Sequence, residues 1–176
     1  MNDPALRSGL GGYVARHERL PTGALTQHDT GELLRRAGLA AGFIVESEFK
    51  RTARGPGGGR RKIDWVWFSP QDRLRPIVAI EIEGRDVDEG SIDADHAKFA
   101  DCGAAVLLLV LFQVDHDLSP KGKPSRGADP VERARRLLAM PEVEVLRDLD
   151  VMAPGGIEGL QVRARAAMAK RMGSPP

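Results

Sequence analysis

The chain has 176 residues, of which 41% are hydrophobic and 29% charged, the balance of a globular protein that is large enough to bury a core. The formal net charge is only +1, and the single cysteine, Cys102, excludes an intramolecular disulfide framework and a cysteine-rich zinc site. The longest apolar run, at 104–112, has the length of a strand and not of a membrane span. Because the N-terminus has no signal-peptide pattern, we expect a cytoplasmic protein without membrane partners.

The first half of the chain is predicted to contain a helix and three strands. Residues 1–29 show no sustained period and are expected to form an irregular arm. A helix is predicted from Thr30, which can serve as its N-cap, to the stop signal at Gly42. Alternating apolar residues then predict three strands, at 43–49, 62–68 and 77–84. In the second strand, Trp65 and Trp67 are expected to lie in the core.

The second half is predicted to alternate helices and strands. Residues 91–102 are expected to form a helix. One face of that helix carries Ile92, His96 and Phe99, so His96 is expected to be packed and hydrogen-bonded. The apolar run at 104–112 predicts a strand that is buried on both sides and paired parallel to a neighbour. The remaining elements are expected to be a helix, a strand and a basic helix, at 130–140, 143–146 and 157–171.

This order of elements predicts the fold class and the division of the chain. The opening strands can meander antiparallel, whereas a strand–helix–strand connection between 77 and 112 implies a parallel pair with a right-handed crossover. We therefore expect an α/β fold with a mixed central sheet flanked by helices. The expected parts are an N-terminal arm at 1–29, a domain at 30–150, and a C-terminal basic helix and tail at 151–176.

Basic and acidic residues are segregated along the sequence. Residues 86–101 are mostly acidic, whereas residues 50–62 contain six cations and no acid, namely Lys50, Arg51, Arg54, Arg60, Arg61 and Lys62. A basic strip beside carboxylates suits a phosphodiester held next to a divalent metal, and solvated faces would produce the same charge pattern. Arg54, Arg60 and Arg61 lie in a glycine-rich turn, which is expected either to contact the DNA backbone together with Lys62 or to remain unengaged.

Three acids interrupt otherwise apolar strand patterns. Asp64 interrupts the second predicted strand. Glu81 and Glu83 follow the apolar run of the third strand, and because they are two residues apart their side chains point to the same face. Pairing of the two strands would bring together three carboxylates, which repel one another unless they are protonated or bridged by a cation. Such oxygen ligands suit Mg²⁺ or Mn²⁺. The alternative is a set of surface acids balanced by nearby arginines.

The order of these motifs resembles that of the PD-(D/E)xK nuclease superfamily, which includes restriction endonucleases and archaeal Holliday junction resolvases. The resemblance covers residues 30–112 and rests on ELLRRAGL from Glu32, KIDWV around Asp64, IVAIEIEG with Glu81 and Glu83, a helix, and AAVLLLV. It implies a restriction endonuclease-like core, in which a helix, a three-stranded meander, a helix and a fourth strand follow one another (αβββαβ). Additional C-terminal helices and a strand would extend that core here.

The resemblance also implies roles for the matching residues. Asp64 and Glu81 match the two acidic metal ligands of the motif. Glu32 matches a helix glutamate that many members use as a further metal ligand, often through water. An exposed helix charge beside two arginines is the alternative for Glu32.

Glu83 occupies the place of the motif lysine, which in the family positions or activates the attacking water. Some restriction enzymes of this class also carry glutamate there and remain active, so Glu83 can accept a proton from water or act as another ligand. Lys98 on the following helix, or Lys62 two residues before Asp64, is a candidate to supply the missing positive charge. The alternative is that Lys98 and Lys62 are ordinary solvated lysines.

We therefore expect a divalent-metal-dependent endonuclease that hydrolyses DNA with a metal-activated water, using Mg²⁺ or Mn²⁺. The missing lysine motivates an alternative, a catalytically inactive nuclease-fold module that binds DNA or a partner protein. A homodimer would place two metal sites against the two strands of a duplex, and dimerisation is left open.

Overall fold

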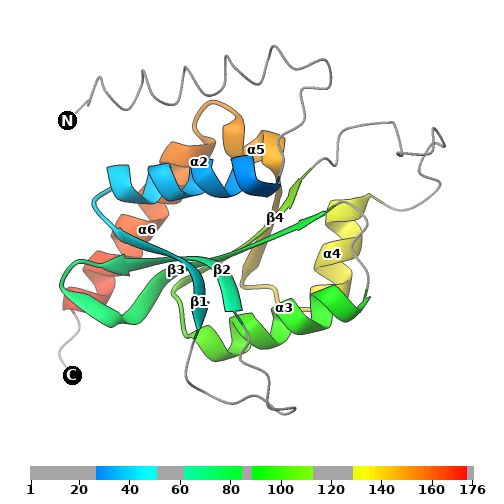
Figure 1. Cartoon of the computed structure of the whole chain (residues 1–176), viewed down its shortest axis with the longest axis horizontal. Helices are drawn as coiled ribbons and strands as arrows, with labels where there is room; N and C mark the ends of the chain where they lie inside the picture. Colours follow the sequence, from blue (N-terminus) through cyan, green and yellow to red (C-terminus); the bar gives the residue numbers. More distant parts are fainter. Residues whose placement is uncertain (1–26, 51–61, 85–88, 113–128, 174–176) are drawn as a thin grey trace.

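The computed structural model describes residues 27–50, 62–84, 89–112 and 129–173. Within these ranges the strands form one mixed sheet that lies between two layers of helices (Figure 1). The elements are, in chain order, α2 Gln27–Ala40, β1 Ile44–Lys50, β2 Lys62–Ser69, β3 Asp72–Gly84, α3 Glu89–Cys102, β4 Val106–Phe112, α4 Pro130–Leu138, β5 Val143–Arg147, α5 Asp148–Met152 and α6 Gly156–Gly173.

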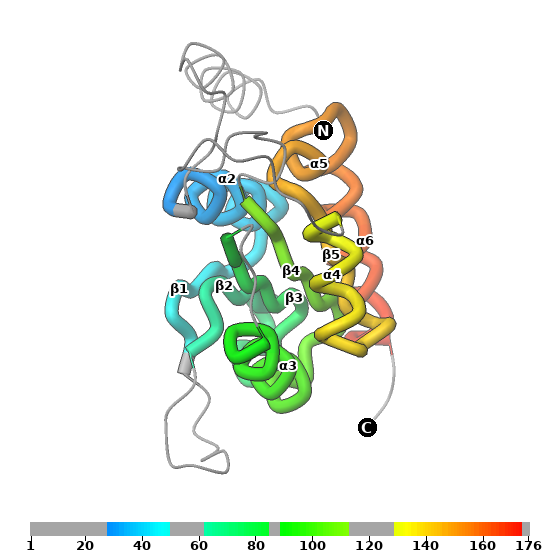
Figure 2. The backbone as a smooth tube through the Cα atoms, turned by 90° about the vertical axis from the view of Figure 1, so that its right-hand side faces the viewer, coloured from blue at the N-terminus to red at the C-terminus, as the bar shows by residue number. Residues whose placement is uncertain are grey.

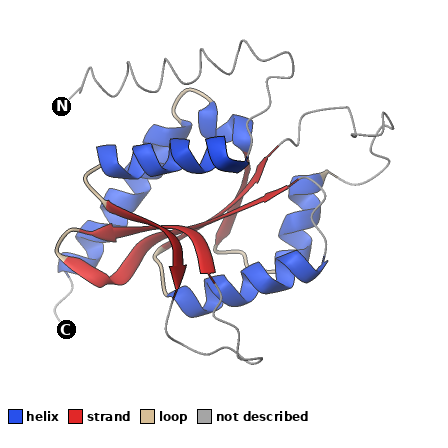
Figure 3. Cartoon of the chain, viewed as in Figure 1, coloured by secondary structure: helices blue, strands red, loops and turns tan. Residues whose placement is uncertain are grey.

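The strand order in the described sheet is β1-β2-β3-β4-β5. The first three strands meander antiparallel, and β4 and β5 are added parallel to β3. Helices α2, α5 and α6 cover one face, and α3 and α4 cover the other (Figures 2 and 3). The expected α/β fold with a mixed sheet flanked by helices is confirmed. No helix in the described part of the chain is long and apolar enough to cross a membrane.

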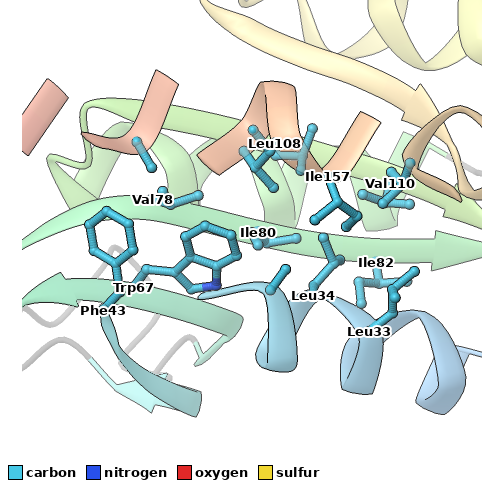
Figure 4. Packing of buried hydrophobic residues seen from close by; sticks show 14 of the residues in the cluster. Leu33, Leu34, Phe43, Trp67, Val78, Ile80, Ile82, Leu108, Val110 and Ile157 are labelled. Carbon is cyan, nitrogen blue, oxygen red and sulfur yellow. The ribbon is translucent and has the colours of Figure 1, made fainter. Parts of the chain in front are cut away.

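A hydrophobic core fills the space between the sheet and the layer of α2 and α6. Trp67 of β2 is fully buried there, and its ring centroid lies 5.6 Å from that of Phe43. Leu34 of α2 packs toward Ile80 and the other apolar side chains of the central strands (Figure 4). Trp65 is half-buried against the same core. Both tryptophans are therefore core residues, as predicted.

A second core lies on the opposite face, beneath α3 and α4. Val66 and Ala79 reach it from β2 and β3, and Leu109 reaches it from β4. Leu108, the neighbour of Leu109 in β4, belongs to the first core. Residues 107–111 are all buried, so β4 is buried on both sides and paired in parallel on both edges, as predicted.

The start of α2 differs from the prediction. The helix already includes Gln27, so Thr30 lies inside it and is fully buried; the N-cap assigned to Thr30 is wrong. Asp29 in the first turn interacts favourably with the positive end of the helix dipole. This interaction stabilises a turn that precedes the apolar stripe from which the helix was predicted. Gly42 follows the helix with a φ of 88°, a left-handed conformation that glycine adopts without strain, so the predicted stop is confirmed.

Candidate functional site

The two central antiparallel strands bring the predicted carboxylates together. Trp65 of β2 pairs with Ile80 of β3, so the next position in each strand places Asp64 beside Glu81. The Asp64 carboxylate accepts a hydrogen bond of 2.9 Å from the backbone N–H of Ile82. Glu83 projects from the same face of β3, two residues beyond Glu81. Asp64, Glu81 and Glu83 therefore form one cluster, on the face that α3 covers.

Helix α3 adds two charged side chains to this carboxylate cluster. The Lys98 ammonium lies 2.8 Å from Oε2 of Glu81 and 2.9 Å from Oδ1 of Asp95. The side chains of Glu81 and Asp95 are each only 1% exposed, and that of Lys98 is 16% exposed. A buried ion-pair network thus joins the C-terminal part of β3 to α3.

The buried face of α3 also differs from the prediction. Ile92, Asp95, Phe99 and Cys102 are buried, whereas His96 is exposed, so the packed role predicted for His96 is wrong. Sequence reasoning missed Asp95 because an aspartate is a poor candidate for an apolar face. Its spacing from its apolar neighbours, three residues after Ile92 and four before Phe99, was the available signal.

Burial raises the pKa values of the carboxylates in the cluster. The pKa of Glu81 rises to about 9, first through burial and then through the charge of Asp64, although Lys98 opposes the rise. Burial and then the charge of Asp95 raise the pKa of Glu83 to about 7. Burial lowers the pKa of Lys98, but its pairing with Glu81 and Asp95 outweighs burial and raises it overall. The cluster thus favours bound protons or a bound cation.

Asp64 also borders a pocket of about 240 Å³. The pocket lies between α2 and the first strands, and its wall includes His28, Glu48, Trp65 and the backbone neighbour Ile82. Burial raises the pKa of Asp64 and the charge of Glu48 adds to the rise, whereas the hydrogen bond from Ile82 and the charge of Lys98 oppose it. A carboxylate at the edge of a pocket is accessible to a ligand, whereas Glu81 lies deeper in the protein.

Two other predicted residues make contacts away from the carboxylate cluster. Glu32 accepts hydrogen bonds from Arg35 at 2.7 and 2.8 Å and from Arg36 at 2.8 Å. The hydrogen bond from Arg35 is the largest cause that lowers the pKa of Glu32 to about 2. Lys62 is exposed and forms an ion pair with Glu48. These contacts favour a helix charge for Glu32 and a surface role for Lys62.

The basic turn is not described. Arg54, Arg60 and Arg61 lie outside the described residues, so their expected contact with DNA stays a prediction.

The donor set of the cluster fits a hard divalent cation. Glu81 has a buried Oε1 and Asp95 a buried Oδ2 without a hydrogen-bond partner, and a cation can satisfy such oxygens. No group of three or more His, Cys, Asp and Glu side chains within the described ranges is arranged to hold a metal. Mg²⁺ is usually bound by only one or two protein carboxylates together with waters and substrate phosphates, which suits Asp64 and Glu81.

No protein-family model, curated protein or solved structure matches the chain. The fold and the site define it as an α/β protein whose mixed sheet carries a buried carboxylate–lysine network.

The raised pKa of Glu83 predicts a pH-dependent stability. A glutamate with a pKa of 4.5 when unfolded and about 7 when folded holds its proton more tightly in the folded state. Its contribution to the free energy of unfolding therefore falls as pH rises from 4.5 to 7 and stays low above 7. The free energy of unfolding, measured with urea, should therefore decline between pH 4.5 and 8, and we expect Glu83→Gln to remove the part of this decline that Glu83 causes. The exposed Glu158→Gln is the control for loss of a charge. Parallel pH profiles for wild type and Glu83→Gln would contradict this account.

Proposed function

We propose that the protein is a divalent-metal-dependent endonuclease that hydrolyses phosphodiester bonds of DNA with an activated water. One observation carries the proposal: Asp64 of β2, Glu81 of β3 and Lys98 of α3 meet in a single cluster. The order of elements supports it, because a helix, an antiparallel meander, a helix and a parallel fourth strand also make up the restriction endonuclease-like core.

Asp64 and Glu81 are the residues that would hold the cation. A bound Mg²⁺ or Mn²⁺ would polarise the phosphodiester and lower the pKa of a water. The N–H of Ile82 fixes the orientation of the Asp64 carboxylate, and the pairing of β2 with β3 fixes its distance from Glu81. The pocket beside Asp64 leaves room for a phosphate group to approach Asp64 from the side of α2, and neither Glu81 nor Lys98 lines that pocket.

Lys98 takes the place of the lysine that the motif lacks. Glu83 carries no positive charge, and Lys62 is engaged by Glu48 on the surface. The Lys98 ammonium, by contrast, lies 2.8 Å from Glu81. A fixed cation there can stabilise the negative charge that develops on the phosphate in the transition state. DNA as the substrate follows from the resemblance and from the basic block of the sequence. A homodimer would place two such sites against the two strands of a duplex.

Cleavage assays test this function. We expect the purified protein to nick or cut supercoiled, linear or branched DNA with Mg²⁺ or Mn²⁺. EDTA should abolish the activity, and so should Asp64→Ala, because one of the two candidate ligands is lost. Asp93→Ala, which removes an exposed aspartate of α3, is the matched control and should cut normally. Undiminished cutting by Asp64→Ala would refute the residue assignment, and no cutting by wild type on any of these substrates would refute the function.

One observation favours a second function, a catalytically inactive module that binds DNA or a partner protein. Lys98 is already paired with both Glu81 and Asp95, so these buried acids share a counter-ion within the chain itself. Such a module would bind DNA in a salt-sensitive manner without metal-dependent cleavage. Titration of labelled DNA at 50 and 200 mM salt, alongside the cleavage assay, separates the two functions.

A further inference from the structure

Asp95 is a charged residue at a position of α3 where the helical period favours an apolar side chain. It lies on α3 between the buried Ile92 and Phe99, and its side chain is 1% exposed. A buried carboxylate costs free energy unless it is paired, and an apolar side chain at such a position is often at least as stabilising as an ion pair. The second oxygen, Oδ2, is buried without a hydrogen-bond partner, and the Glu83 carboxyl places a further acid close to Asp95, so the pairing with Lys98 does not balance the local charge. Packing alone therefore does not account for an aspartate here.

The contact made by the other oxygen suggests a reason. Oδ1 of Asp95 lies 2.9 Å from the Lys98 ammonium, one helical turn away on the same face. A lysine side chain has four flexible carbons and loses rotamer entropy when it is held in one place. A single contact with Glu81 would leave the ammonium free to pivot, whereas two carboxylates from two different elements define its position.

We propose that Asp95 is a positioning residue, which holds the Lys98 ammonium against Glu81 so that a lysine of α3 serves a site built on β2 and β3. The inference deepens the proposed function, and its catalytic part rests on that function. Asp95 acts through Lys98 and contacts neither the pocket beside Asp64 nor, by this account, the substrate. The alternative role, Asp95 as a cation ligand in its own right, is an outcome of the test.

The position of the ammonium can be tested without any activity. In ¹⁵N-labelled protein, NMR detects lysine ammonium groups that are held by carboxylates, and Lys98→Arg identifies the Lys98 signal. We expect this signal in wild type and in Asp93→Asn, and we expect Asp95→Asn to lose it or shift it to the range of exposed lysines. A coupling across the hydrogen bond from Lys98 ¹⁵Nζ to Asp95 ¹³Cγ, measured in wild type, tests the same contact if Asp95→Asn does not fold. An unchanged Lys98 signal in Asp95→Asn, or a wild type without the coupling, would overturn the proposal.

The catalytic part is tested by steady-state kinetics with Mg²⁺ and DNA. We expect Asp95→Asn to lower kcat roughly ten- to hundredfold, as the loss of a supporting hydrogen bond does at metal sites, and to leave KM for DNA unchanged. Asp95→Asn should cost nothing further in a Lys98→Met background, because the two residues act as one unit. An additive loss in the double variant would instead make Asp95 a ligand, and an unchanged or raised kcat in Asp95→Asn would overturn the proposal. A wild type without cleavage refutes the proposed function, and the Lys98 signal still decides the positioning.

Discussion

Glu81→Gln is expected to reduce Mg²⁺-dependent DNA cleavage at least about a hundredfold without destabilising the fold. A divalent cation contributes several kcal/mol to transition-state stabilisation, and each 1.4 kcal/mol corresponds to a factor of ten in rate, so loss of one of two protein ligands has a large effect. The glutamine keeps the shape of Glu81 and the contacts of its side chain with the surrounding strands. It removes the anionic oxygens that would bind the cation.

Stability should survive this change for an electrostatic reason. Burial disfavours the charged form of Glu81 and raises its pKa, so the fold does not depend on that charge. Lys98 remains paired with Asp95 at 2.9 Å, so removal of the Glu81 charge leaves no buried cation without a partner. Urea unfolding and cleavage rates should be measured on the same preparations, with Glu158→Gln as a surface control. Cleavage by Glu81→Gln within a few-fold of wild type would exclude Glu81 as a ligand.

Trp67→Ala is expected to lower the free energy of unfolding by about 3–5 kcal/mol. Trp67 is fully buried between β2 and α2, and its ring packs on Phe43. The helix approaches so closely that a Cβ added at Gly38 would lie 2.7 Å from Cε2 of the Trp67 ring. A domain of this size is typically stable by about 5–15 kcal/mol, so the truncation would remove a large fraction of the total.

Two variants control the tryptophan prediction. Trp67→Phe keeps an aromatic ring, and Nε1 of Trp67 has no hydrogen-bond partner among the described residues, so the loss should be clearly smaller than for alanine. Leu74→Ala truncates a side chain that is 90% exposed, and its effect should stay within about 0.5 kcal/mol. Urea or thermal unfolding followed by circular dichroism measures all three. Equal midpoints for Trp67→Ala and Leu74→Ala would contradict the packing described here.

The strands could be predicted from sequence because their period is unambiguous. The alternation around Asp64 and the two-residue spacing of Glu81 and Glu83 determine which side chains share a face, and the β2–β3 pairing then brings these acids together. The first part of β3 was missed because the hairpin pairs Ser69 with Asp72, well before the apolar run begins. Turn-proximal residues carry no apolar alternation, so the pattern cannot reveal their pairing.

The helical half of the site was harder to predict. Around α3 a rotation of one residue exchanges His96 for Asp95 on the buried face, and an apolar pattern favours histidine over aspartate there. Whether Lys98 or Lys62 meets Glu81 depends on the tertiary contact between α3 and β3, which no local spacing encodes. Likewise, Glu32 has two arginines within one turn, and only the structure shows that both are bonded to it.

The strand β3 is paired antiparallel to β2 as far as Ile80, whereas its parallel pairing with β4 continues past Glu81 and Glu83 to Gly84. Opening it requires both ladders to break, an event close to global unfolding. The stretch of β3 from Val78 to Ile80, which is paired on both edges, is therefore expected to be among the last parts of the molecule to exchange its amide hydrogens. We therefore expect the site to adjust to a ligand mainly through side-chain rotation on α3, where Lys98 contacts both Glu81 of β3 and Asp95.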